Sequence, residues 1–152
     1  MMRDSLLEFA RSMNEIMPVI AQGFARRHVK GFYRCRLTLP QILILDFLNQ
    51  QGESKMTDMA HFMRVTTAAM TGLADRLVRD GYLMRVYDPA DRRVIKVRLT
   101  SRGNELVKKI NDQRRKMVIK ILSQISEADR KDYLRILMQI KEILTKENSS
   151  EK

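Results

Sequence analysis

One short hairpin constrains the fold of this 152-residue chain more than any other segment, because the sequence around it has helical spacing. Residues 82–87 and residues 94–99 are rich in the β-branched, aromatic and other apolar residues that are typical of strands. The charged turn between them carries two adjacent arginines, Arg92 and Arg93. A basic hairpin of this kind is suited to contacting phosphates or entering a groove, so nucleic acid is the partner that best explains it.

The composition agrees with a polyanionic partner and excludes several other classes of protein. The formal net charge is +11, although charge alone does not distinguish DNA from RNA or an anionic membrane. No apolar run is long enough to span a bilayer, and the N-terminus lacks the order of residues found in signal peptides. A single cysteine, Cys35, excludes an intrachain disulfide. We therefore expect a cytoplasmic protein of one domain, with or without extended arms, and no membrane partner.

Amphipathic helices are predicted at both ends of the chain. Apolar residues recur at helical spacing over residues 4–27, where Pro18 predicts a kink or a break, and residues 28–36 are expected to form a linker. After residue 103 the same spacing returns, and Ser126 is expected to cap the last helix. A lone amphipathic helix leaves its apolar stripe uncovered. The arms are therefore expected to pack together in a homodimer; a monomer whose arms fold back on the centre is the alternative.

The centre of the chain has the spacing of a helix-turn-helix. A helix that begins at residue 38 or 40 and ends at Gly52 is followed by two short helices, residues 56–63 and 66–79. Thr57 is expected to cap the first of these short helices, and Thr66 or Thr67 is expected to cap the second. Only two residues separate them, which is the length of a helix-turn-helix connection, and the hairpin follows directly.

The order of these elements resembles the MarR family of bacterial regulators. The resemblance rests on an Asp-x-Arg motif near the hairpin tip and a Leu-Thr-x-x-Gly motif after the hairpin, whose residues are Asp91, Arg93, Leu99, Thr100 and Gly103. Residues 65–77 and 80–83 are similar to the family's recognition helix and its exit. The likeness covers nearly the whole chain.

The resemblance implies a mainly α fold with a small two- or three-stranded sheet, a winged helix-turn-helix with helical dimerisation arms at both ends. We expect an N-terminal arm and linker over residues 1–37, a DNA-binding lobe over residues 38–100 and C-terminal dimerisation helices over residues 101–152. The implied protein is a dimeric regulator of pseudo-palindromic double-stranded DNA. It is usually a repressor that a small ligand or oxidation releases.

Two groups of residues are expected to contact DNA. Small or polar side chains at the start of the recognition helix would let its backbone sit deep in a major groove: Arg64, Thr66, Thr67, Ala68 and Thr71. On the hairpin, the resemblance implies that Arg93 enters a minor groove, and Asp91 is expected to orient it. Phosphate contacts are expected from Arg92, Lys96 and Arg98. The ordinary alternatives are an amphipathic helix with threonine caps and a solvated charged turn.

The recognition helix carries a further expectation for its packing. Its apolar side is expected to face the core, through Val65, Met70, Leu73 and Leu77. Gly72 lies in its middle, where glycine costs about 1 kcal/mol relative to alanine. Close approach of the backbone to DNA or to a neighbouring helix would explain a glycine there.

An effector pocket is expected between the arms and the lobe. Its predicted lining is Met13, Met17, Phe24, Phe32, Tyr33 and Phe47, with Arg34 or Arg36 to pair an acidic ligand such as an acidic aromatic. For each apolar residue, the alternative to a place in the pocket is a place in the hydrophobic core of the dimer. Cys35 lies between two arginines, which favour a reactive thiolate, but sensing cysteines of the family lie within the first helix. An incidental cysteine is therefore favoured, and redox sensing stays an alternative.

Catalysis and metal binding are not expected. The two histidines, His28 and His61, lack a second strong ligand at helical spacing, and the sequence offers no nucleophile–base pair, so we predict no enzyme, no metal and no cofactor. Two further hypotheses stay open beside the regulator. One is a sequence-independent architectural binder of nucleic acid, and the other is a helical interaction module that binds an acidic partner.

Overall fold

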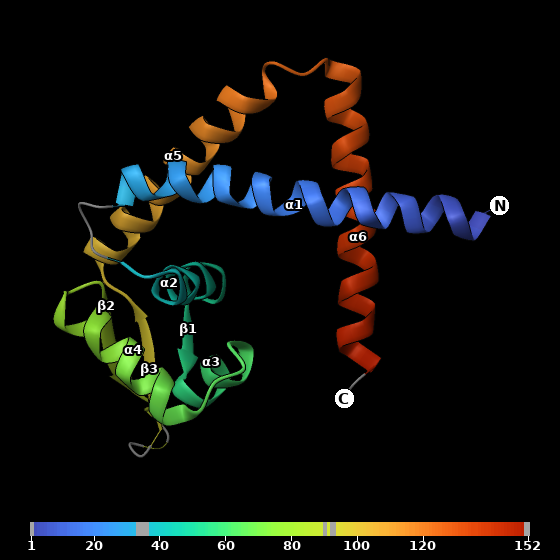
Figure 1. Ribbon diagram of the computed structural model, residues 1–152. Helices are drawn as coiled ribbons and strands as arrows, with labels where there is room; N and C mark the ends of the chain where they lie inside the picture. Colours follow the sequence, from blue (N-terminus) through green and yellow to red (C-terminus); the bar gives the residue numbers. More distant parts are fainter. Residues whose placement is uncertain (1, 33–36, 90, 92–93, 151–152) are drawn as a thin grey trace. The chain divides into compact units, whose positions relative to one another are not determined.

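The computed structural model describes residues 2–32, 37–89, 91 and 94–150 of the chain (Figure 1). The helices and strands are α1 (Met2–Phe32), α2 (Leu39–Gln51), β1 (Glu53–Lys55), α3 (Met56–Phe62), α4 (Thr67–Arg79), β2 (Leu83–Tyr87), β3 (Ile95–Leu99), α5 (Ser101–Leu122) and α6 (Glu127–Ser150). The expected fold class, mainly α with a small sheet, is confirmed. The chain divides into two compact units, residues 1–113 and residues 114–152.

The first unit is built around a three-stranded antiparallel sheet in the order β1–β3–β2. Strand β3 is central, with Ser54 opposite Val97 on one side and Leu83 opposite Leu99 on the other. Helices α2 and α4 contact the sheet and each other, and α3 contacts α4. The largest fully buried side chains of this unit are Ile44, Leu45, Leu48, Met59, Met70, Leu77, Leu83, Val97, Val107 and Ile110.

Local capping chemistry fixes several helix ends where the sequence predicts them. Helix α4 begins after Thr66, whose hydroxyl oxygen accepts a hydrogen bond from the Ala69 amide at 3.2 Å. In the second unit, the Ser126 hydroxyl oxygen accepts one from the Asp129 amide at 3.1 Å at the start of α6. Gly52, in a left-handed conformation with φ 81°, ends α2.

The structure departs from several expectations about the elements. Pro18 does not break the first helix, since α1 runs on to Phe32 and takes up part of the expected linker (Figure 1). On an exposed helix water can satisfy the one carbonyl that proline leaves without a partner. Thr57 is not the cap of α3; Lys55 is, because strand β1 ends there and leads directly into the helix. Strand β1 is an element that periodicity did not reveal, and α6 extends to Ser150.

Candidate nucleic-acid interface

The turn between α3 and α4 presents an arginine in an unusual backbone conformation. Arg64 has φ 52°, and it is the one non-glycine residue with positive φ in the described part of the chain. Its amide donates to the His61 carbonyl at 3.1 Å, and the next amide, of Val65, donates to the Ala60 carbonyl at 3.0 Å. A left-handed turn at a side chain costs roughly 1–2 kcal/mol, so the surrounding hydrogen bonds must hold it. The result is an exposed arginine directly before the recognition helix.

The start of α4 exposes the small and polar side chains that the sequence singled out. Thr66, Thr67 and Ala68 are exposed, and Thr71 is half-buried. The Thr66 hydroxyl accepts a capping bond and keeps its proton for another acceptor. The Thr71 hydroxyl donates to the Thr67 carbonyl at 2.8 Å and keeps an oxygen lone pair for another donor. The start of the helix therefore offers a ligand both a hydrogen-bond donor and a hydrogen-bond acceptor.

The opposite face of α4 packs into the core, with one correction to the expected set. Met70 and Leu77 are fully buried and Leu73 is half-buried, as expected. Val65 is 37% exposed, because it lies in the turn before the helix and does not follow the helical period. Ala74, which is 1% exposed, belongs to the buried face instead. The expected face was drawn from large apolar residues, so the small alanine was not included.

Gly72 lies on the exposed side of α4 with empty space around it. A Cβ atom built there would meet no atom of the chain within 4 Å. A neighbouring helix within the described chain therefore does not account for this glycine. Close approach by another molecule remains the explanation that the packing allows.

The hairpin that follows α4 is a regular antiparallel pair up to its tip. Tyr87 lies opposite Ile95, the Asp88 amide donates to the Val94 carbonyl at 3.0 Å, and the Val94 amide donates to the Asp91 carbonyl at 2.9 Å. Arg92 and Arg93 lie outside the described residues. Their DNA contacts, and the pairing of Asp91 with Arg93, stay predictions.

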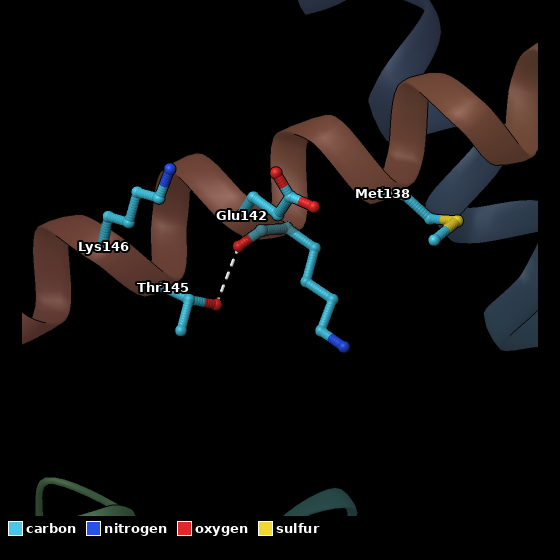
Figure 2. A pocket seen from close by; sticks show the side chains of 5 residues that line it. Met138, Glu142, Thr145 and Lys146 are labelled. Carbon is cyan, nitrogen blue, oxygen red and sulfur yellow. Dashed lines mark hydrogen bonds between the residues drawn. The ribbon is translucent and has the colours of Figure 1, made fainter.

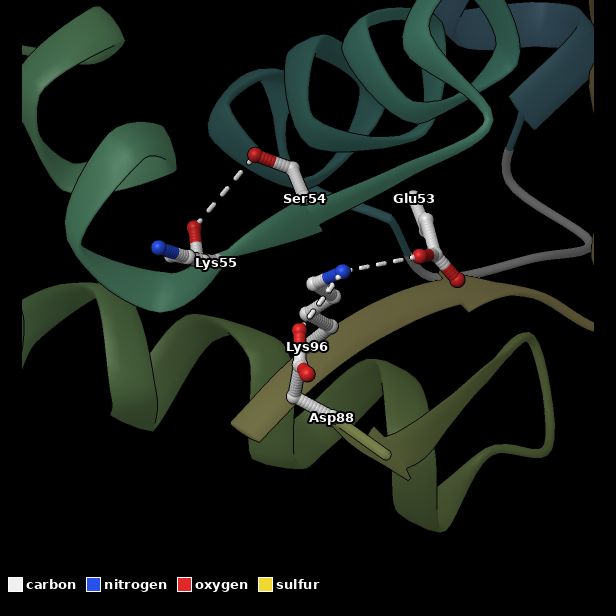
Figure 3. A network of polar contacts seen from close by, with 5 residues as sticks. All are labelled: Glu53, Ser54, Lys55, Asp88 and Lys96. Atoms are coloured by element: carbon white, nitrogen blue, oxygen red, sulfur yellow. Dashed lines mark hydrogen bonds and ion pairs between the residues drawn. The ribbon is translucent and has the colours of Figure 1, made fainter. Parts of the chain in front are cut away.

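Lys96 lies between two carboxylates in the network of Figure 3. Its Nζ is 3.2 Å from Oε1 of Glu53 on β1 and 3.0 Å from Oδ2 of Asp88, just after β2. The hydrogen bond that Lys96 donates to Asp88, followed by the one it donates to Glu53, raises the pKa of Lys96 above its usual 10.5. Lys96 is therefore charged throughout the neutral range. Neither partner was anticipated from the sequence, since Glu53 is 43 positions away.

A second ion pair joins the hairpin to the recognition helix. The Arg85 guanidinium on β2 donates to the Asp75 carboxylate on α4. Both side chains are about half exposed, so the pair contributes at most about 1 kcal/mol to stability. The ion pair holds the hairpin against α4, and both of these elements were predicted to contact DNA.

The Leu-Thr-x-x-Gly segment forms a tight junction between the exit of α4 and the start of α5. The Thr100 hydroxyl donates to the Gly81 carbonyl at 2.6 Å and accepts from the Gly103 amide at 3.0 Å. The Thr100 amide donates to the Tyr82 carbonyl at 3.0 Å. Gly103 is buried against the same carbonyl: a Cβ there would lie 2.1 Å from the Tyr82 oxygen. Only glycine fits at this position without a shift of the backbone.

The expected effector pocket is not assembled by the residues that the structure describes. Phe47 packs on Phe62 with ring centroids 4.5 Å apart, and Met13 and Met17 are 37% and 49% exposed on α1. The side chain of Phe32, together with Tyr33, Arg34, Cys35 and Arg36, lies outside the description. Phe24 is half-buried. The pocket, and any role of the cysteine, stay predictions.

A hollow that the structure does describe lies elsewhere, on α6 (Figure 2). All of its lining comes from one helix: Met138, Lys141, Glu142, Thr145 and Lys146. The Thr145 hydroxyl donates to the Lys141 carbonyl at 2.7 Å, within the helix itself. A hollow with a single wall encloses no ligand, and none of the predicted pocket residues belongs to it.

Within the described part of the chain, no three side chains of the metal-binding types lie together. The helices described there also include none that is long and apolar enough to cross a membrane.

Comparison with known proteins finds similarity to transcriptional regulators. Residues 37–95 match the family model described as the MarR family. The HTH-type transcriptional regulator YfiV of Bacillus subtilis is 32% identical over 78 residues, which are 51% of this chain and 49% of that protein, so this match spans about half the length of the relative. The HTH-type transcriptional repressor MdtR of the same organism is 27% identical over 127 residues, 84% of this chain and 77% of that protein.

A solved structure agrees over a longer stretch. The structure of a MarR family protein from Bacillus stearothermophilus superposes with a TM-score of 0.82 at 21% identity, covering 91% of this chain and 96% of the other. At this identity the likeness concerns the fold.

Proposed function

Because residues 37–95 match the MarR family model, we propose that the chain is a transcriptional repressor of that family and that it binds a pseudo-palindromic DNA operator as a homodimer. The observation that carries the proposal is the exposed start of α4, where Arg64, Thr66, Thr67 and Ala68 project from a helix whose other face is fixed in the core. A net charge of +11 supplies attraction to the phosphate backbone.

In this proposal α4 enters the major groove by its N-terminal half. Thr66 donates to a phosphate or a base edge, and Thr71 accepts from an amino group such as that of adenine or cytosine. Ala68 and the open side of Gly72 let the backbone approach the bases closely. Arg64, held in its left-handed turn, contacts the flanking phosphates.

The wing contributes the second contact. We assign Arg93 to a minor groove, where narrow A·T-rich DNA has a strongly negative potential, and Arg92 to the adjacent phosphates. Asp91 serves to orient Arg93. The proposal for these residues rests on their match to the family motif at the tip of the hairpin.

Dimerisation is assigned to the two ends of the chain. Large apolar side chains on α1 and α6 are 37–68% and 41–59% exposed, among them Leu6, Phe9, Ile16 and Ile20 on α1, and Leu134, Leu137, Ile140 and Ile143 on α6. Helices this apolar need a partner surface in water. A second copy of the chain would cover them and place two recognition helices in successive major grooves, with half-sites about 10 base pairs apart.

Release by an effector follows from the same architecture. A small ligand, such as an acidic aromatic, would favour one separation of the two lobes over another, and only such a differential affinity can shift their balance. Oxidation of Cys35 is the alternative signal. DNA binding that survives both peroxide and a panel of aromatic acids would remove the release step and leave the repressor itself intact.

Selection of bound sequences from random double-stranded DNA tests the proposal. We expect one pseudo-palindrome to emerge, with an affinity at least about a thousandfold above that for unrelated duplex. Equal affinity for all duplexes would instead identify an architectural binder, whose only requirement is the basic charge. Failure to bind any duplex at low salt would favour a module for an acidic protein partner.

Replacing Gly72 with alanine separates stability from binding. The new methyl group has open space within the chain, so we expect the free energy of unfolding to rise by about 1 kcal/mol. If the backbone at Gly72 lies against the groove, affinity for the selected duplex should fall on the order of tenfold. Binding to unrelated duplex, which depends on phosphates, is the control and should hardly change. Raised stability with unaltered specific affinity would place Gly72 away from DNA.

A further inference from the structure

Lys96 has the charge of a phosphate contact but not the surroundings of one. It lies on β3, the central strand, with Lys55 of β1 and Val86 of β2 directly opposite it. These residues alternate with the buried Ser54 and Val97, so they share the outer face of the sheet. On that face the Lys96 side chain is only 24% exposed, because its ammonium group is turned toward carboxylates from both neighbouring strands (Figure 3).

The ammonium group of Lys96 is already paired within the protein. Carboxylate oxygens of Glu53 and Asp88 lie 3.2 and 3.0 Å from its Nζ. To bind a phosphate, Lys96 would have to give up two ion pairs and leave two carboxylates beside the DNA backbone. The raised pKa of Lys96 agrees with a lysine whose charge is satisfied within the protein.

The position of Asp88 gives the cluster a mechanical role in the wing. Asp88 lies just after β2, and its amide donates to the Val94 carbonyl, so it closes the hairpin where the tip segment leaves the sheet. Its carboxylate is 3.0 Å from Lys96 Nζ, and the same ammonium reaches Glu53 at the far edge of the sheet. One lysine therefore ties the base of the tip segment, which carries Arg92 and Arg93 in the sequence, to all three strands.

From this geometry we propose that Lys96 is a positioning residue for DNA binding: with Glu53 and Asp88 it fixes the base of the wing, and it does not contact phosphate. This inference rests on the proposed function. It replaces the phosphate role that sequence alone assigned to Lys96, and it gives Glu53 and Asp88 a role in DNA binding although both carry the charge that DNA repels.

The sign of the Asp88→Asn effect is the decisive measurement. Affinity for the selected duplex is measured by fluorescence anisotropy from 50 to 300 mM KCl for the wild type, Lys96→Gln, Asp88→Asn and the double variant. We expect Lys96→Gln and Asp88→Asn each to weaken binding by about tenfold, and the double variant to be no weaker than the worse single one. The salt dependence of Lys96→Gln should match that of the wild type. Lys96→Arg, which can still bridge both carboxylates, should restore affinity.

A phosphate contact predicts the reverse. Asp88→Asn would then tighten binding by removing a negative charge, and Lys96→Gln would lower the salt slope by about one contact per subunit. Either result would overturn the proposal.

Hydrogen exchange tests the positioning role without DNA. The Asp88 and Val94 amides, which hold the base of the tip, should exchange at least about tenfold faster in Lys96→Gln, while core amides of α2 stay protected. Arg98→Gln is the matched control, since it removes the same charge from the same face of β3 and should leave both amides protected. Unchanged protection in Lys96→Gln would overturn the inference. If no duplex is selected at all, the repressor proposal fails, and the exchange result still decides the role of Lys96.

Discussion

Alanine at Gly103 is expected to destabilise the DNA-binding lobe by about 3 kcal/mol or more. The added Cβ would lie 2.1 Å from the Tyr82 carbonyl oxygen and 3.2 Å from Cδ2 of Leu99. A backbone oxygen cannot rotate away as a side chain can, so the chain must shift. That shift would break the hydrogen bonds by which Thr100 holds Tyr82 and Gly81. Urea unfolding followed by circular dichroism, at one fixed protein concentration because a dimer is expected, measures the loss.

Gly72→Ala is the matched control for this experiment. Both glycines are helical and both substitutions add one methyl group, yet only Gly103 has an atom of the chain in the way. The two variants should therefore change the free energy of unfolding in opposite directions. A Gly103→Ala protein as stable as the wild type would mean that Tyr82 and α5 do not meet as described.

The second large effect is on DNA affinity, which should fall about a thousandfold between 50 and 200 mM salt. The reason is counter-ion release. If Arg64 and Arg92 of both subunits each neutralise a phosphate, and Arg93 of both subunits adds its charge in a minor groove, the logarithm of affinity falls with a slope of about −5 against the logarithm of salt. Fluorescence anisotropy with the selected duplex gives this slope directly.

Single substitutions show whether these arginines are the source of the slope. Arg92→Ala should make the salt slope shallower by nearly two, because one phosphate contact is lost from each of the two subunits. Lys131→Ala is the control, because this lysine of α6 pairs with Glu127 at 2.7 Å and should leave the slope unchanged. Equal effects of both variants would instead point to a general electrostatic field without defined contacts.

Features that depend on neighbouring residues were predictable from the sequence. Thr66 and Ser126 cap helices through amides three positions away, and Gly52 ends α2 through its own backbone freedom. The two hairpin strands and the short connection between α3 and α4 also follow from local spacing. These signals sufficed to expect a winged helix-turn-helix.

Features that depend on distant residues were not predictable in this way. Strand β1 forms because Ser54 pairs with Val97 on β3. A segment of three residues is too short to show a strand periodicity, so the sequence did not indicate this pairing. Lys96 resembled a phosphate contact because a sequence shows its charge and not its carboxylate neighbours. The ion pair of Asp75 with Arg85 was not predicted for the same reason. Pairing across the sheet depends on register, which is a property of the fold.

The junction of Thr100 with Gly81 and Gly103 also affects how the family motif should be interpreted. Leu-Thr-x-x-Gly is one of the motifs on which the resemblance to a family of DNA-binding regulators rests. Every contact described for Thr100 and Gly103, however, is with the chain's own backbone or the Leu99 side chain. The motif is needed to attach α5 to the lobe, whatever the lobe binds. A relative that had lost its operator would still retain it for stability. Its presence is thus evidence of architecture, and evidence of DNA recognition must come from the exposed residues of α4 and the wing.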